Sequence, residues 1–327
     1  MRPAHGLPQS VGAHTGRTRG NWTEADHGRK RAHPAPGGDD QNGQNPAYAG
    51  ARIGADRVAA RFGCALAHAV PKKPDDVDEQ HALLRAVHAE RPDAVLIAPA
   101  HATRLNGTLR AMQEDGIHIL CFVSRPEAFE PTCFVGSDYR ALARANAHHL
   151  FDRLQGRGRV VSLEGHPDAI TTAPRAEGFR TAAAEQEDVG IVNARPGYYL
   201  RDGGHRGMRE LLSAEARIDG VLAANDAMAL GALDALREAG RPLPIVGINA
   251  TLEGVAAIKA GELLASAAFD AMKLACLGVE AALRSLGGER VPAEILLPVE
   301  VVDHSNCGVW DLPYTERSLP DWAECVR

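Results

Sequence analysis

Residues Gly220 to Leu230 constrain the fold more than any other stretch of the chain. They comprise a short run of small apolar residues, two turn-forming residues, and a run with helical periodicity that continues to Leu236. A continuous apolar run bounded by turn residues is typical of a parallel strand covered on both faces. The stretch therefore predicts a buried strand, a sharp turn at Asn225 and Asp226, and an apolar helix.

The turn at Asn225 and Asp226 has two interpretations. In open α/β sheets, ligands bind outside the carboxyl ends of the strands, so both side chains fall where a small molecule would bind. Asn and Asp are also preferred helix N-caps, because their side-chain oxygens accept hydrogen bonds from free backbone N–H groups. On spacing alone, a ligand-binding role and a capping role both remain open.

The same alternation of strand-like and helix-like runs continues from Asn45 along most of the chain. It predicts an α/β fold with parallel sheets and right-handed crossovers. Apolar residues make up 45% of the chain but aromatic residues only 5%, which is typical of helices packed on a parallel sheet. Besides the strand after Gly220, the expected strands are Cys64–Ala69, Ala94–Pro99, Ile117–Val123, Arg159–Glu164, Ile191–Ala194, Pro244–Asn249, Leu263–Phe269 and one final strand at Ile295–Val302. Residues Phe134 to Asp138 read as a transition between two halves.

The first 44 residues differ abruptly from the rest. They are rich in Gly, Pro, Arg, His, Asp and Asn and show no apolar periodicity, so we expect a disordered or aberrant segment that cannot bury enough surface to fold. The N-terminus shows no basic start followed by an apolar run, so no signal peptide is visible. No apolar run is long enough to span a bilayer, and we expect no direct membrane insertion.

Charge, cysteine spacing and motifs exclude several function classes. A net charge of -6 offers no excess of basic residues for nucleic acid. The six cysteines include no C-x-x-C pair, so no metal site is expected. The chain contains no phosphate-binding loop, no G-x-S-x-G elbow and no H-E-x-x-H motif. We therefore predict a non-catalytic protein without a cofactor.

Several pieces in a fixed order make the chain resemble a known family. Asn45-Pro46-Ala47-Tyr48 opens a helix, Ser124-Arg125 follows a strand, and Arg175-Ala176-Glu177-Gly178-Phe179 lies on a helix; Ala224 to Ala232 and Val246-Gly247-Ile248-Asn249 complete the set. Over roughly Asn45 to Val302, the chain resembles the periplasmic sugar-binding proteins of bacterial ABC transporters, of the ribose-binding-protein type. The run around Asn225 is the most specific part of the match.

The resemblance implies two doubly wound parallel-sheet lobes, joined by a multi-strand hinge, that close on one sugar. It also implies a periplasmic or extracellular monomer that takes a small carbohydrate and passes it to an ABC-transporter permease. The implied divisions are an N-terminal segment 1–44, a first lobe 45–137 plus 270–298, a second lobe 138–269 plus 299–306, and a tail 307–327. The residues implied to line the cleft are Asn45, Tyr48, Ser124, Arg125, Arg175, Tyr199, Asn225, Asn249 and Phe269. Their side chains suit a polyhydroxylated ligand, since they combine hydrogen-bonding groups with aromatic faces.

Departures from the family pattern refine these expectations. The family often has Asp where this chain has Ser124 and Asn249, and this loss of carboxylates would leave Arg125 and Arg175 less neutralised. We therefore expect a sugar acid, or a polyol that needs fewer acceptors. The family usually has a polar side chain where Phe269 stands, which indicates a drier cleft. Residues 35–42 cannot form the first strand that the family places there, because they contain Pro, Gly and two Asp residues.

Two other function classes remain as alternatives. A ligand-sensing domain of a lactose-repressor-type transcription regulator would share these lobes, but it would need a helix-turn-helix ahead of them. Residues 1–44 have only scattered apolar residues, so this reading requires a regulator that lacks its DNA-binding domain. An enzyme on a doubly wound fold is the other alternative. The adjacent His148 and His149 point in different directions on a helix, which is typical of surface residues and not of a metal site.

Overall fold

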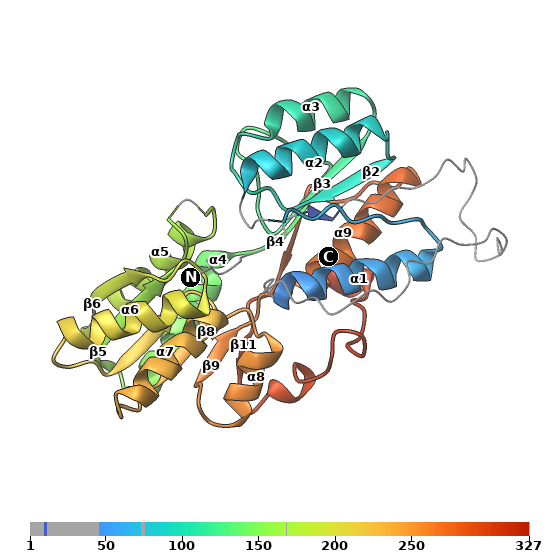
Figure 1. Cartoon of the computed structure of the whole chain (residues 1–327). Coiled ribbons are helices and arrows are strands. Elements are labelled where there is room, and N and C mark those ends of the chain that lie inside the picture. Colours follow the sequence, from blue (N-terminus) through green and yellow to red (C-terminus); the bar gives the residue numbers. More distant parts are fainter. Residues whose placement is uncertain (1–9, 12–45, 73–75, 168, 327) are drawn as a thin grey trace.

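The computed structural model describes residues 10–11, 46–72, 76–167 and 169–326. Within them the chain forms two sheets, each flanked by helices, which confirms the expected α/β fold with two parallel-sheet lobes. Figure 1 shows the two lobes and the segments that cross between them. The exact lobe boundaries implied by the family resemblance stay predictions.

The first lobe is built on a sheet with the strand order β1-β2-β3-β4-β10. Neighbouring strands are parallel except β1, which pairs antiparallel with β2 through Ser10–Ile97 and Val11–Leu96. The strands are β1 (Ser10–Val11), β2 (Ala94–Ile97), β3 (His118–Phe122), β4 (Cys133–Ser137) and β10 (Glu294–Leu297). The helices are α1 (Pro46–Phe62), α2 (Val77–Ala89), α3 (Asn106–Glu114) and α9 (Ala271–Leu286).

Strand alternation explains how this sheet buries both faces. On β2, Leu96 packs in the core shared with α1 and α9, whereas Val95 and Ile97 pack in a second cluster with α2 and α3. On β3, Leu120 packs in the core shared with α1 and α9, and Ile119 packs in the second cluster. Successive side chains of a strand point to opposite faces, so a strand that is apolar at every position requires helices on both sides of its sheet.

The second lobe is built on a sheet with the strand order β11-β9-β8-β7-β5-β6. All neighbouring strands are parallel except β11, which pairs antiparallel with β9. The strands are β5 (Arg157–Glu164), β6 (Asp188–Pro196), β7 (Gly220–Ala223), β8 (Ile245–Ile248), β9 (Ala265–Ala267) and β11 (Val301–Asp303). The helices are α4 (Tyr139–Arg153), α5 (Thr172–Ala184), α6 (Arg201–Ala214), α7 (Asp226–Glu238) and α8 (Leu252–Lys259).

Glycines allow α6 and α7 to approach until their backbones touch. A Cβ atom on Gly231 would lie 2.0 Å from the carbonyl oxygen of Arg201, and one on Gly204 would lie 2.4 Å from that of Met228. Real Cβ atoms essentially never come within 3.0 Å of another heavy atom. Both positions therefore require glycine for the close packing of the two helices.

The chain crosses between the sheets from β4 to α4, from β9 to α9 and from β10 to β11. The first two crossings end at an aspartate that caps the next helix. Asp138 accepts a hydrogen bond from the backbone N–H of Ala141 at 2.9 Å, and Asp270 accepts one from Lys273 at 2.9 Å. A side-chain cap satisfies backbone groups that the helix itself leaves free, so each helix starts at a defined residue where the chain enters a new lobe.

Two strand expectations are wrong. Cys64 to Ala69 was expected as a strand but forms only an isolated bridge position at Ala67, and its residues are exposed or half-buried. Within residues 10–11, 46–72, 76–167 and 169–326, this run contributes no strand to the first sheet. Ile295 to Val302 is two strands, because residues 298–300 carry the chain from the first sheet, at β10, to the second, at β11.

The structure describes only two residues of the N-terminal segment that we expected to be disordered or aberrant. Most of residues 1–44 lie outside the described residues, but Ser10 and Val11 form the short strand β1 on the edge of β2. The expectation of a disordered or aberrant segment therefore does not hold at these two residues and stays a prediction for the rest.

The buried carboxyl group of Asp226 joins three elements of the second lobe. Asp226 lies at the start of α7 and is fully buried. Its Oδ1 accepts a hydrogen bond from Ser266 Oγ on β9 at 2.6 Å, and its Oδ2 accepts one from the backbone N–H of Thr251, the N-cap of α8, at 2.8 Å. The hydroxyl group of Thr251 donates a further bond at 3.1 Å. One side chain thus fixes the ends of α7, α8 and β9 relative to one another.

We predict that Asp226→Ala lowers the free energy of unfolding by about 3 kcal/mol, because it leaves buried donors without an acceptor. Asp234→Ala, on the same helix, is the matched control. It removes exposed ion pairs to Arg201 and Arg237 and should cost no more than about 1 kcal/mol. Urea unfolding followed by circular dichroism measures both. Equal losses for the two variants would contradict the role given to Asp226.

The stability contributed by Asp226 should depend on pH. Burial raises the pKa of this carboxyl group, against the lowering effect of the hydrogen bonds from Ser266 and Thr251. Just above the ordinary pKa of about 3.9, the folded state therefore holds a proton that the unfolded chain has released. Stability then falls as pH rises through this window. The advantage of the native protein over Asp226→Ala should shrink from pH 4 upward in urea titrations, and an advantage that grows with pH would contradict the raised pKa.

Candidate ligand-binding site

Arg175 is the centre of a cluster of aromatic side chains in the second lobe. It lies on α5 and is only 4% exposed. Its guanidinium carbon lies 5.3, 5.5 and 5.9 Å from the ring centres of Tyr139, Tyr199 and Phe269. Its Nη1 donates a hydrogen bond to the carbonyl oxygen of Ala224, at the end of β7, at 2.5 Å. The cation is therefore fixed at the carboxyl end of a strand, where α/β sheets bind ligands.

Two buried polar atoms near these strand ends have no hydrogen-bond partner among the described residues. They are Nε of Arg175 and Oδ1 of Asn249. Asn249 follows β8, is 8% exposed, and its backbone N–H donates to the carbonyl oxygen of Ala267 on β9 at 2.9 Å. Buried polar groups without a partner are rare and costly. A donor and an acceptor at these strand ends thus lack a partner among the described residues.

Asn225 proves to be a helix cap. Its Oδ1 accepts the backbone N–H of Met228 at 2.9 Å, and its Nδ2 donates to the carbonyl oxygen of Tyr199 at 3.0 Å. The capping interpretation of the turn is therefore confirmed. The bond to Tyr199 also ties α7 to the loop between β6 and α6, where Tyr198 and Tyr199 both have positive φ angles of 56° and 61°.

Tyr139 is the residue of this cluster that the sequence did not single out. It is the first residue of α4, yet its hydroxyl group donates a hydrogen bond at 2.5 Å to the carbonyl oxygen of Val123, which follows β3 in the first lobe. Its ring packs at 5.7 Å from that of Phe269. Its only sequence signal is an aromatic residue directly after the capping Asp138. Tyr139 links the two lobes at the first crossing.

The loop that Tyr139 holds is strained. Val123 has a φ of 63°, in the left-handed region that β-branched residues avoid. The next residue, Ser124, donates its backbone N–H to the carbonyl oxygen of Phe122 at 2.6 Å, which closes a three-residue turn. Ser124 is buried at 9% exposure. The turn directs the chain into Ser124 and Arg125 at the end of β3.

Arg125 is already paired with carboxylates. Its Nη1 lies 2.8 Å from Glu294 on β10, its Nη2 lies 3.2 Å from Glu130, and its side chain is 41% exposed. Its guanidinium group also lies over the ring of Phe134 at 5.6 Å. The expectation that Arg125 is left less neutralised is therefore wrong, because Glu130 and Glu294, which lie outside the family motif, form ion pairs with it.

Tyr48 and Tyr199, which the sequence also predicted as site residues, lie in different lobes. Tyr48 lies in α1, is 8% exposed and packs edge-on against Phe122 at 6.5 Å between ring centres. Tyr199 donates to or accepts from Thr171 at 2.8 Å and accepts from Thr172 at 3.0 Å. Asn45 lies outside the described residues. The structure therefore brings Arg175, Tyr199 and Phe269 together, whereas a ligand-binding role for every predicted residue stays a prediction.

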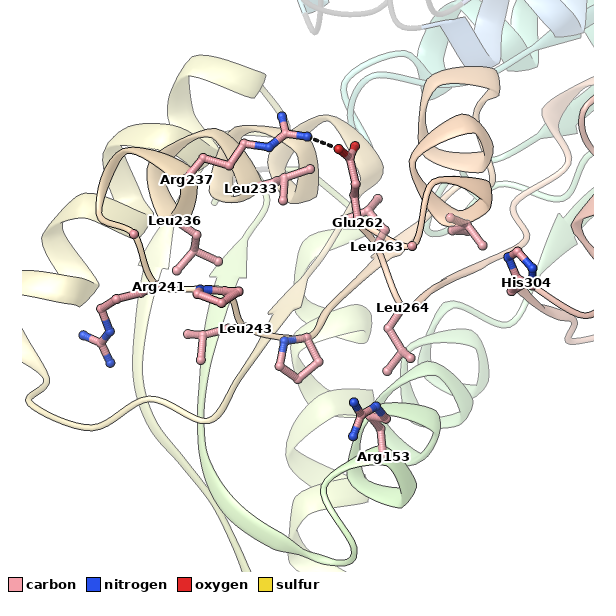
Figure 2. A pocket seen from close by; sticks show the side chains of 15 residues that line it. Arg153, Leu233, Leu236, Arg237, Arg241, Leu243, Glu262, Leu263, Leu264 and His304 are labelled. Carbon is pink, nitrogen blue, oxygen red and sulfur yellow. Dashed lines mark hydrogen bonds and ion pairs between the residues drawn. The ribbon is translucent and has the colours of Figure 1, made fainter.

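A separate hollow of about 730 Å³ lies at the far end of the second lobe (Figure 2). Its floor is apolar, and its lining includes Arg153, Arg237 and Arg241. Figure 2 shows Arg237 reaching across to Glu262, with which it forms an ion pair. The hollow adjoins the carboxyl ends of α4, α7 and α8, where cations stabilise the helix dipole. These arginines therefore have a structural explanation.

Among the residues that the structure describes, no group of three or more His, Cys, Asp or Glu side chains could hold a metal ion. Within the same residues, no helix combines the length and the apolarity that crossing a membrane requires.

Two parallel-sheet lobes, with a buried arginine and aromatic rings at the strand ends, are features of a two-lobed solute-binding protein. A model of the periplasmic binding protein domain matches residues 41–290. The chain belongs to this family, whose members bind solutes and catalyse no reaction.

Individual relatives agree with this assignment. The chain is 27% identical over 237 residues to the xylitol-binding protein of Mycolicibacterium smegmatis. The matched residues make up 72% of this chain and 68% of that protein. It is 26% identical over 257 residues to the ribose import binding protein of Bacillus subtilis. This match covers 79% of this chain and 83% of that protein. A solute-binding protein of Actinobacillus succinogenes with bound D-allose has a similar fold, with a TM-score of 0.78 and 24% identity over 80% of this chain and 95% of that one.

We predict that Tyr139→Phe lowers the free energy of unfolding by about 1 kcal/mol, because it removes the hydrogen bond to Val123 but keeps the ring on Arg175. Tyr139→Leu should cost more, since it also removes the aromatic contacts. Thermal unfolding of both variants measures the difference. A Phe variant as unstable as the Leu variant would mean that the hydroxyl group, and not the ring, accounts for the whole contribution of Tyr139.

Proposed function

We propose that this protein binds a small neutral sugar or polyol between its two lobes and delivers it to the permease of an ABC transporter. The observation that carries the proposal is that two buried atoms, Arg175 Nε and Asn249 Oδ1, have no hydrogen-bond partner in the described part of the chain. The first is a donor and the second an acceptor. A hydroxyl group both donates and accepts hydrogen bonds, so a polyhydroxylated ligand can satisfy the two atoms.

The aromatic side chains support the same class of ligand. Tyr139, Tyr199 and Phe269 surround Arg175 and offer apolar faces against which the C–H groups of a sugar or polyol can pack. A ligand without apolar surface would gain nothing from these rings. The names of the relatives, which bind xylitol, ribose and D-allose, support a ligand of this size and chemistry.

The charge arrangement favours a neutral ligand over a sugar acid. Arg125 is neutralised by Glu130 and Glu294. Arg175 interacts electrostatically with the carboxyl group of Asp226 and donates to a backbone carbonyl oxygen. Arg125 is therefore neutralised and Arg175 already has a hydrogen-bond acceptor, so the expectation of an acidic ligand loses its main support.

In this proposal the lobes close by motion at the crossings, and the closed form is the one that the permease recognises. A ligand shifts such an equilibrium only by binding the closed form better than the open one. The proposed ligand contacts are those implied by the family resemblance: Asn45, Tyr48, Ser124, Arg125, Arg175, Tyr199, Asn225, Asn249 and Phe269. The proposed location is the periplasm, where the protein would act as a monomer.

We predict that a thermal-unfolding scan against pentoses, hexoses, pentitols, inositols and sugar acids finds its largest shift with a neutral sugar or polyol. A ligand at about a hundred times its dissociation constant stabilises the folded state by roughly 2.7 kcal/mol. A larger shift with a sugar acid than with any neutral compound would overturn the choice of ligand class. No shift with any of these compounds would overturn the proposed function.

We predict that Arg175→Lys weakens binding of the best ligand at least about tenfold, because lysine lacks the Nε–H and the planar group that stacks between the rings. Arg180→Lys, on the same helix, is the matched control, since Arg180 is 62% exposed and lies 4.0 Å from Glu164. Isothermal titration calorimetry measures both affinities, and unfolding scans show whether each variant is folded. Unchanged binding by a folded Arg175→Lys variant would remove Arg175 from the ligand site.

A further inference from the structure

The segment after β11 returns from the second lobe to the first and lies on both. It comprises a short 3-10 helix at Cys307–Val309, a loop, and the helix α10 (Trp322–Cys325). Figure 1 shows it running from beside α8 to α1 and α9. It is therefore a fourth connection between the lobes, in addition to the crossings from β4 to α4, from β9 to α9 and from β10 to β11.

Its attachment to the second lobe includes an exposed ion pair. Asp311 pairs with Lys259, the last residue of α8, and the two side chains are 40% and 48% exposed. Nearby, the indole N–H of Trp310 donates to Glu300, in the β10–β11 crossing, at 3.1 Å. Trp310 itself is 7% exposed and belongs to the main core. This end is thus held by the buried side chains of Cys307 and Trp310 and by one solvent-exposed pair.

Its attachment to the first lobe is more extensive. Arg57 on α1 donates hydrogen bonds to the carbonyl oxygens of Tyr314 at 2.9 Å and of Arg317 at 2.6 Å. The ring of Tyr314 lies so close to Gly50 on α1 that a Cβ atom there would be 2.7 Å from it. Farther along, the guanidinium carbon of Arg284 on α9 lies 4.8 Å from the ring centre of Trp322.

A buried arginine keeps the connecting loop short and rigid. Arg317 is 8% exposed and donates to the carbonyl oxygens of Trp310 at 2.5 Å and of Leu312 at 2.9 Å. Its guanidinium group also lies over the rings of Trp310 and Tyr314, at 5.4 and 4.6 Å. The loop between the two attachments therefore has its own internal support.

The chain length between the attachments limits how far the lobes can separate. Asp311 and Tyr314 are three residues apart, and three fully extended residues reach only about 11 Å. Any opening that draws Asp311 and Tyr314 farther apart than this must break an attachment. The exposed pair of Lys259 and Asp311 is the one that yields first, because exposed ion pairs are weak.

We propose that residues 307–326 form a strap that limits the opening of the lobes and thereby favours the closed, ligand-binding form. The proposal rests on the proposed function in so far as it concerns ligand affinity, but the limit on opening is a property of the protein alone. Because apparent affinity falls in proportion to the fraction of binding-competent molecules, releasing the strap weakens binding without touching the ligand.

A charge-swap experiment on the full chain tests the strap. Lys259→Asp places two carboxyl groups opposite each other and should release the strap. The double variant Lys259→Asp with Asp311→Lys restores a pair of opposite charge. The matched control is Glu185→Lys, which breaks a pair with Arg144 of similar exposure, 37% and 48%, within the second lobe. Circular dichroism melting verifies that each variant is folded.

Small-angle X-ray scattering without ligand measures the opening directly. We expect a larger radius of gyration for Lys259→Asp, and native values for the double variant and the control. For the ligand that stabilises the native protein most, we expect the dissociation constant of Lys259→Asp to rise about threefold or more and to return in the double variant.

The outcomes separate the two proposals. If no ligand stabilises the native protein, the proposed function fails, while the scattering comparison still decides the strap. If ligands bind but Lys259→Asp scatters and binds like the control, the strap proposal fails and the proposed function stands. A weakened Lys259→Asp variant that the double variant does not rescue would also overturn the strap, since a local effect of residue 259 would then explain the result.

Discussion

The buried carboxyl group of Asp226 is the interaction on which the candidate site depends. It accepts hydrogen bonds from β9 and from the N-cap of α8 while it starts α7. The residues that follow the neighbouring strand ends, Asn225 and Asn249, are held by elements that this group joins. A charged or protonated carboxyl group in such a place is expensive to bury unless it is fully bonded. The hydrogen bonds from Ser266 and Thr251 offset that cost.

This arrangement clarifies why polar residues at strand ends were hard to assign from the sequence. Of the neighbouring pair, Asn225 caps a helix and Asp226 ties elements together, although both stand where a ligand would bind. Arg125 and Arg175 carry the same charge, but the first is paired with glutamates and the second is enclosed by aromatic rings. Residue type and position in the sequence narrow the list of candidate ligand-binding residues. The hydrogen-bond and ion-pair partners of each candidate, however, depend on the rest of the fold.

Most elements could be predicted from the sequence because their signals are local. The apolar runs at β2, β3, β7 and β8 lie within a residue or two of their expected bounds, and so does the helix from Pro46 to Phe62. The failures share a cause that is not local. Cys64 to Ala69 has the composition of a strand but forms only an isolated bridge position at Ala67, and Ile295 to Val302 is apolar apart from Glu300 although it serves two different sheets. The bond of Tyr139 to Val123 joins residues from different lobes, which no periodicity reveals.

The contact between α6 and α7 has a consequence for how binding could be communicated. Their backbones touch at Gly204 and Gly231, so neither helix can slide or tilt without collision. Such a pair behaves as a single rigid block, and interdomain motions in proteins of this kind concentrate in a few connecting residues. In the proposed function, α6 and α7 would therefore move together as one body when the lobes close, and the connecting segments would absorb the rotation.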